Sequence, residues 1–130
     1  MTWINLEILN FNKTNLFGTI PTEMGLLFRL KILHFEANNL SGTIPTQLGK
    51  LNELLHVSFG LNSLIENLPT ELGKCTKLRK IDFSQNHLKG SMEIVQLKEV
   101  NEFSLNDNYF VGSIPFGIGE WKSLRSREYT

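Results

Sequence analysis

A 24-residue periodicity constrains the fold of this chain more than any other feature of its sequence. The string Gly-Thr-Ile-Pro-Thr begins at Gly18 and recurs at Gly42, 24 residues later. Rows of this length, the fourth of them two residues shorter, begin at Leu6, Leu30, Leu54, Leu78 and Val100. All four prolines fall in one column, at Pro21, Pro45, Pro69 and Pro115. A fixed period of this length predicts a solenoid in which each row is one structural unit.

Within each row, apolar residues at the fourth and sixth positions alternate with mostly polar residues at the third, fifth and seventh. This alternation predicts a short strand whose apolar side chains point inward. One strand leaves its backbone groups unpaired, so the strands of successive rows are expected to pair as a parallel sheet. The sixth position holds Phe11, Phe35, Phe59 and Phe83, which we expect to form an internal stack of offset rings.

The ninth position of the rows is an asparagine column with a structural role, made up of Asn38, Asn62, Asn86 and Asn108. A carboxamide has one acceptor and two N–H donors. We expect each side chain to bond the backbone of its own turn and of the next row. A second column holds glycine in four rows and Glu66 in the third, so the backbone at Glu66 is expected to avoid a positive φ.

The row pattern L-x-x-L-x-L-x-x-N-x-L-x-G-x-I-P-x-x-L-G-x-L-x-x resembles the leucine-rich repeat, and specifically its plant-type subclass marked by L-x-G-x-I-P. The resemblance implies an α/β fold, a right-handed horseshoe-shaped solenoid with a parallel sheet on the concave face and short 3₁₀ or irregular convex segments. Residues 1–130 then form a single array with repeats at 6–29, 30–53, 54–77, 78–99 and 100–123 and partial repeats at both ends. Further repeats or caps are expected in a longer parent protein.

Side chains that point out of the expected sheet form a shallow, mostly polar face rather than a catalytic pocket. Solenoids bind ligands across such surfaces, so we expect a protein, peptide or glycan ligand there. The candidate binding residues are Ile8, Asn10, Asn12, Ile32, His34, Glu36, His56, Ser58, Lys80, Asp82, Ser84, Glu102, Ser104 and Asn106.

The charge balance and the lack of catalytic motifs argue against several other classes of function. Lys plus Arg and Asp plus Glu both number 13, and this balance does not favour a nucleic-acid-binding or membrane-surface protein. Phosphate-binding, hydrolase and zinc-protease motifs are missing, so we expect no enzyme, cofactor or metal. His34 and His56 lie on neighbouring expected strands, near Glu36 and Asp82. These groups leave a metal site and a pH-sensitive contact as weaker hypotheses.

The resemblance favours non-enzymatic recognition by a fragment of a receptor-like kinase or receptor-like protein ectodomain. The alternatives are a secreted defence protein resembling polygalacturonase inhibitors, an ice-adsorbing array and an intracellular interaction scaffold. The location is extracellular or membrane-anchored if the segment belongs to a longer protein, and cytoplasmic if the chain is complete as given. The segment itself is not expected to contact a membrane.

Two further local features carry expectations. The triplets Asn12-Lys13-Thr14 and Asn39-Leu40-Ser41 are acceptor motifs for N-linked glycosylation in a secreted chain. Asn39 is the stronger candidate, because a glycan on Asn12 would obstruct the candidate face. The fourth row loses the Ile-Pro pair and two residues, and a local irregularity is expected over residues 91–99.

Overall fold

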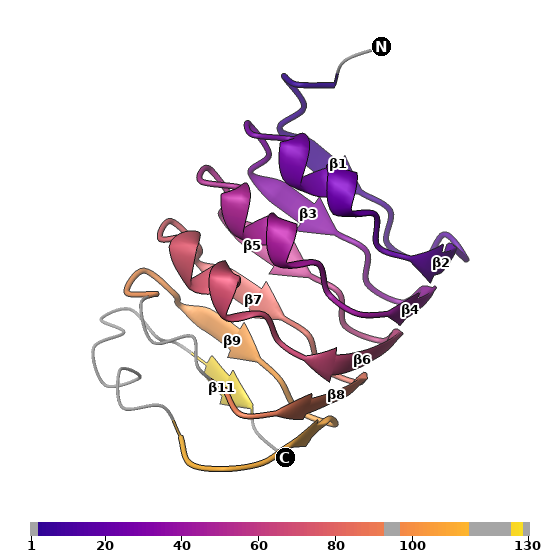
Figure 1. Cartoon of the computed structure of the whole chain (residues 1–130), viewed down its shortest axis with the longest axis vertical. Helices are drawn as coiled ribbons and strands as arrows, with labels where there is room; N and C mark the ends of the chain where they lie inside the picture. The colour runs from indigo at the N-terminus through magenta and orange to yellow at the C-terminus, as the bar shows by residue number, and fades with distance from the viewer. Residues whose placement is uncertain (1–2, 93–96, 115–125, 129–130) are drawn as a thin grey trace.

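The computed structural model describes residues 3–92, 97–114 and 126–128, the last three by their backbone alone. The chain winds as a solenoid whose successive turns are stacked along one axis, from the indigo N-terminal turn to the orange and yellow C-terminal turns (Figure 1). The expected leucine-rich-repeat solenoid fold is confirmed, with low helix content. Among the described residues, no helix is long and apolar enough to cross a membrane.

The first sheet takes one strand from each turn, and all neighbouring strands are parallel. Third-position residues pair with third-position residues, from Ile8 with Ile32 to Lys80 with Glu102. Successive turns therefore lie in register, and equal positions of the rows form straight columns across the sheet. The strands of this six-stranded sheet are β1 (Ile8–Asn10), β3 (Ile32–His34), β5 (His56–Ser58), β7 (Lys80–Asp82), β9 (Glu102–Ser104) and β11 (Ser126–Glu128).

A second parallel sheet runs beside the first, although the sequence predicts only one strand per row. It forms where each turn leaves the asparagine column, because the extended backbone there meets the same segment of the next turn (Figure 1). Its strands are β2 (Phe17–Thr19), β4 (Asn39–Gly42), β6 (Ser63–Asn67), β8 (His87–Gly90) and β10 (Tyr109–Phe110).

Short 3₁₀ helices close the first three turns, and each begins directly after the proline of its row. They are η1 (Thr22–Leu26), η2 (Thr46–Lys50) and η3 (Thr70–Lys74). Proline suits this position because its fixed φ continues into a helix and its missing N–H would have no partner there. The glycines of η1 and η2 lie close against the next helix: a Cβ added to Gly49 would lie 2.5 Å from the carbonyl oxygen of Glu71.

The core contains the expected column of phenylalanine rings. Phe35, Phe59 and Phe83 stack in parallel with centroids 5.4 and 5.8 Å apart, a spacing that makes the rings offset. Phe11 tilts by 41° against Phe35 and keeps 39% of its surface exposed. In the shortened fourth row, residues 93–96 lie outside the described residues, but Leu97 is fully buried in the core.

Hydrogen bonds from the asparagine column join each turn to the one before it, not to the next one as expected. The Nδ2 group of Asn62 donates to the carbonyl oxygens of Phe59 and Gly60 in its own turn and to Phe35 in the preceding turn, at 2.9–3.2 Å. Its Oδ1 accepts from the N–H of Leu40, also in the preceding turn, at 2.9 Å. Asn38, Asn86 and Asn108 repeat this arrangement. We call this set of bonds the asparagine ladder.

Just before the ninth position of each row, the backbone enters the left-handed region without using glycine. The eighth-position residues have φ between 53° and 57°; they are Lys13, Ala37, Leu61, Gln85 and Asp107. A side-chain-bearing residue in this region costs about 1 kcal/mol or more. The same turn is repeated along the array because each ladder asparagine bonds the carbonyl groups that this conformation exposes.

The structure contradicts the expectation for Glu66, whose φ is +67°. Its column has a positive φ in every row, between 76° and 98° at Gly18, Gly42, Gly90 and Gly112. Pairing of β6 with both β4 and β8 imposes the conformation whatever the residue is. Glu66 therefore adopts a strained backbone conformation, and its carboxylate lies 3.3 Å from the Lys89 ammonium.

The ladder predicts a large effect of removing one carboxamide from the middle of the array. Asn62→Ala should lower the free energy of unfolding by roughly 1–3 kcal/mol, because buried backbone groups of two turns lose their partners. Urea unfolding followed by circular dichroism measures this change. Asn52→Ala, at an exposed asparagine outside the ladder, is the matched control and should change the stability little. Equal stability of the two variants would contradict a structural role for the ladder.

The backbone at Glu66 predicts an unusual order of two small residues. Glu66→Gly should be more stable than Glu66→Ala by roughly 1 kcal/mol, because glycine adopts a positive φ without the steric cost that alanine meets. Both variants lose the Lys89 ion pair equally, so their difference in urea midpoint isolates the backbone term. An alanine variant at least as stable as the glycine variant would refute the strain.

Candidate functional site

The outward side chains of β1, β3, β5, β7 and β9, with the seventh-position residues that follow these strands, make up a surface that we call the six-stranded face. All fourteen candidate binding residues lie on it. Ile8, Asn10 and Glu102 are exposed, and ten others are half-buried: Asn12, Ile32, His34, Glu36, His56, Lys80, Asp82, Ser84, Ser104 and Asn106. Because the strands are in register, these side chains form columns across neighbouring turns.

Ser58 departs from the expectation that it faces solvent, since only 2% of its surface is exposed. It is paired with His34 on one neighbouring strand and Asp82 on the other. Both neighbours are longer, so the small serine is covered by them. Its Oγ and the Nε2 of His34 are buried without a hydrogen-bond partner among the described residues. The middle of the face therefore holds two polar atoms to which the described residues give no hydrogen bond.

Leu61 borders the six-stranded face and lies outside the fourteen candidates, although the row pattern already places it on the expected concave surface. It follows β5 at the eighth position, in the left-handed turn, and 44% of its surface is exposed. Ile8 and Ile32 are the apolar candidates on the face, so Leu61 adds a third apolar side chain. The other rows carry lysine, alanine, glutamine or aspartate at this position.

Hydrogen bonds hold most polar side chains of the face in fixed positions. The Asn12 Oδ1 accepts from the N–H of Glu36 on the next turn at 2.7 Å. The Asp82 carboxylate accepts from both the N–H and the Oγ–H of Ser84, at 3.0 and 2.7 Å. Local bonds of this kind reduce the entropy that side chains lose when a ligand orders them. The face is thus preorganised as a binding surface.

An ion pair joins the two C-terminal candidate strands, with the Lys80 ammonium 3.3 Å from the Glu102 carboxylate. Both side chains are more than a third exposed, and such pairs contribute about 0–1 kcal/mol to stability. In protein interfaces generally, charges of this kind steer partners and disfavour wrong ones.

The imidazole rings of His34 and His56 stack on each other at the centre of the face. Their centroids are 6.1 Å apart and their planes differ by 6°. Burial lowers the pKa of both side chains below the ordinary value of 6.5. The cations Lys80 and Arg79 lower these pKa values further. The carboxylates Glu36, Asp82 and Glu102 oppose the lowering. The fold therefore favours the neutral rings.

No three histidine, cysteine, aspartate or glutamate side chains gather in a metal-binding arrangement in the part of the chain that the structure describes. The one cysteine, Cys75, is fully buried, and its Sγ donates to the carbonyl oxygen of Leu48 at 3.3 Å. Burial raises the pKa of the Cys75 thiol to about 11. A thiol that stays protonated and inaccessible is a poor nucleophile.

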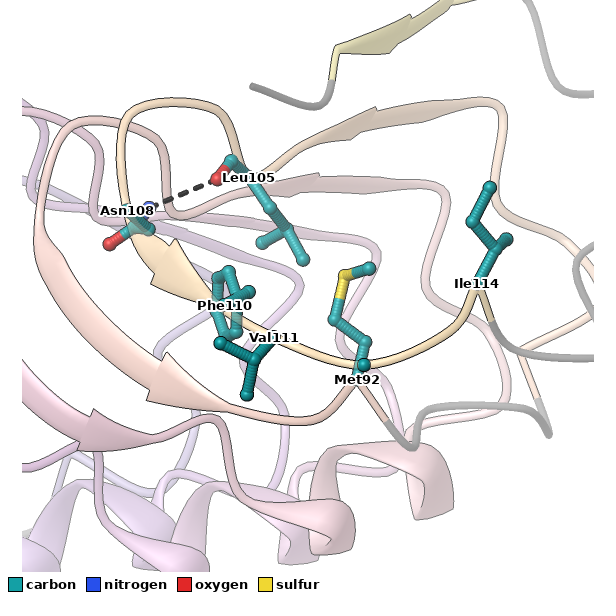
Figure 2. A pocket seen from close by; sticks show the side chains of 7 residues that line it. Met92, Leu105, Asn108, Phe110, Val111 and Ile114 are labelled. Carbon is teal, nitrogen blue, oxygen red and sulfur yellow. Dashed lines mark hydrogen bonds between the residues drawn. The ribbon is translucent and has the colours of Figure 1, made fainter.

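A cavity of about 250 Å³ lies between the fourth and fifth turns, away from the six-stranded face. Figure 2 shows Met92, Leu105, Phe110 and Ile114 pointing into the space from these turns, beside the ladder residue Asn108. Leu105 and Phe110 occupy the columns that hold Phe59 and Leu64 in the third row, where both are fully buried. Val111 and Ile114, which also line the space, keep 69% and 59% of their surfaces exposed, so it opens from the core columns to the surface.

Comparison with known proteins agrees with this geometry. A family model described as Leucine Rich Repeat matches residues 29–51. The chain has the leucine-rich-repeat fold, and this segment of it matches the model of that family. Comparison with curated proteins found no significant match. Solved structures of plant receptors, however, superpose closely on the array.

Three of these structures illustrate the similarity. The TDR receptor is 35% identical with a TM-score of 0.89, over 95% of this chain and 22% of that one. The second is the ectodomain of the Arabidopsis thaliana membrane receptor kinase GASSHO1/SCHENGEN3 in complex with CASPARIAN STRIP INTEGRITY FACTOR 2. It is 30% identical with a TM-score of 0.90, over 98% of this chain and 15% of that one. The third is the Arabidopsis receptor kinase HAESA in complex with the peptide hormone IDA and the co-receptor SERK1. It is 29% identical with a TM-score of 0.87, over 95% of this chain and 22% of that one.

The array thus spans about one fifth of the length of these receptors. It resembles a segment of their ectodomains in fold and in sequence.

The histidine pair predicts that the array loses stability on mild acidification. A lowered pKa in the folded state means that the unfolded chain binds more protons, so stability is full above pH 6.5 and declines as the pH falls below it. The Tm should therefore fall between pH 7.5 and pH 5.5. In the variant His34→Gln/His56→Gln this fall should be smaller. His87→Gln, which leaves the pair intact, should retain it. An unchanged pH slope in the double variant would contradict the assignment.

Proposed function

We propose that the array is a non-enzymatic recognition module, a segment of a receptor-like ectodomain that binds a protein or peptide ligand on its six-stranded face. The observation that carries the proposal is the face itself. It presents columns of fixed polar side chains with three apolar ones among them, Ile8, Ile32 and Leu61. Reacting groups of an enzyme would need to converge in a pocket, whereas this surface is extended.

The charge pattern supports an extended partner that crosses several strands. The N-terminal part of the face carries the exposed apolar Ile8, the centre carries the neutral histidine pair, and the C-terminal part carries the Lys80–Glu102 pair. A peptide lying across the strands would meet these three environments in sequence. Adjacent strands are roughly 4.8 Å apart, so the described face has the reach of a short extended peptide rather than of a single small molecule.

The similarity to plant receptor ectodomains gives this proposal its biological setting. The GASSHO1/SCHENGEN3 ectodomain was solved in complex with CASPARIAN STRIP INTEGRITY FACTOR 2, and the receptor kinase HAESA with the peptide hormone IDA. By this likeness we place the array outside the cell or anchored to its surface, within a longer protein. Signalling would then belong to other parts of the parent protein.

Exchanging two charges tests the face without removing an interaction. In Lys80→Glu/Glu102→Lys the ion pair persists with its direction reversed, so the stability should remain while the charge pattern is inverted. Bacterially produced array is immobilised and exposed to a plant extracellular extract, and the captured proteins and peptides are identified by mass spectrometry. The species captured by the wild type should decrease at least tenfold with the double variant.

The matched control is the corresponding exchange on the second sheet, Glu66→Lys/Lys89→Glu, which inverts an exposed ion pair of that sheet. This control should capture the same species as the wild type. The proposal fails if the wild type captures nothing that the face variant loses. It also fails if the second-sheet variant causes the greater loss.

A further inference from the structure

The two glycosylation motifs lie in different surroundings. Asn12 is half-buried on the six-stranded face, and its carboxamide is held against the next turn by the N–H of Glu36 at 2.7 Å. Asn39 is exposed in β4, on the outer surface of the second sheet. None of the hydrogen bonds found among the described residues involves the Asn39 carboxamide. Its Nδ2 is therefore free to carry a substituent, and the six-stranded face stays open when it does.

A large apolar ring lies beside Asn39. Phe17 in β2 is the direct register partner of Asn39, so their Cα atoms are neighbours across the two strands. Phe17 keeps 84% of its surface exposed, more than any other large hydrophobic residue that the structure describes. Burying a phenylalanine is worth roughly 1.5–3 kcal/mol, so an exposed ring on a sheet surface offers a favourable contact to whatever covers it.

Ser41 completes the acceptor motif from the same strand. Its side chain is exposed, and its Oγ makes only a long contact of 3.4 Å with the carbonyl oxygen of Gly18. The buried Leu40 between Asn39 and Ser41 anchors the strand to the core. Asn39, Ser41 and the ring of Phe17 therefore form one accessible patch on the second sheet.

We propose that Asn39, and not Asn12, carries an N-linked glycan, and that the first sugar of this glycan lies against the ring of Phe17. The proposal rests on the extracellular setting proposed above, because only a secreted chain meets the donor. The donor is an oligosaccharide linked to a lipid diphosphate. The Asn39 Nδ2 bonds to C1 of the sugar, the C1–oxygen bond breaks with its electron pair going to the diphosphate, and the nitrogen releases one proton.

The physical consequence is a glycan that shields the most exposed ring that the structure describes. The pyranose of the first sugar has an apolar face, which replaces water over Phe17. The sugar chain then extends away from the second sheet. The six-stranded face, on which Asn12 lies, keeps its whole area for a ligand.

The acceptor is tested by fusing the chain to a secretion signal and expressing it in plant cells. Mass spectrometry before and after enzymatic deglycosylation gives the number of glycans. The wild type and Asn12→Gln should carry one, whereas Asn39→Gln and Ser41→Ala should carry none. A glycan on Asn12, or no glycan on the secreted wild type, would overturn the assignment.

The contact with Phe17 is tested by trimming the glycan to a single N-acetylglucosamine and comparing thermal unfolding with that of fully deglycosylated protein. The single sugar should raise the Tm of the wild type by roughly 2–4 °C. It should leave the Tm of Phe17→Ser unchanged. Phe17 is exposed, so this variant is expected to fold. An equal Tm increase in both proteins would refute the contact. Because the capture experiment uses bacterial, unglycosylated protein, neither failure here bears on the proposed recognition by the six-stranded face.

Discussion

The structure depends on the hydrogen bonds that the ladder asparagines make to two successive turns. Each turn places a residue in the left-handed region and directs carbonyl and N–H groups into the interior. Buried groups of this kind cost about 1–3 kcal/mol each when they lack a partner. A carboxamide at the ninth position supplies both donors and an acceptor, so one side chain satisfies the turn and fixes it to its neighbour. Removing it would disturb the register on which both sheets rely.

That register also creates the recognition surface. Because third-position residues pair with third-position residues from Ile8 to Glu102, side chains far apart in the sequence become neighbours across the strands. The stacked histidines and the Lys80–Glu102 pair both arise in this way. Surface residues can thus differ between related arrays while the inward columns preserve the fold. This separation explains how a segment about 30% identical to receptor ectodomains superposes on them so closely.

Much of the fold could be predicted because each inward column repeats the same kind of residue in several rows. The phenylalanine stack followed from four phenylalanines at one spacing, and the strands followed from the alternation around them. Besides the direction of the asparagine bonds, the predictions that were wrong concern two single residues whose environment the neighbouring turn imposes. Ser58 is buried because longer side chains flank it, and Glu66 has a positive φ because the strands on both sides require it. The sequence of one row carries no signal for either effect.

The period, the inward columns and the approximate position of the candidate face are determined by the sequence alone, since they depend only on which positions are apolar and how far apart they lie. The second sheet, the direction of the asparagine bonds and the surroundings of the two glycosylation motifs required the tertiary structure. These features arise when one turn meets another, and their energies belong to pairs of groups 20–27 residues apart. The same stacking leaves Asn39 beside Phe17 on one sheet and Asn12 tied to Glu36 on the other.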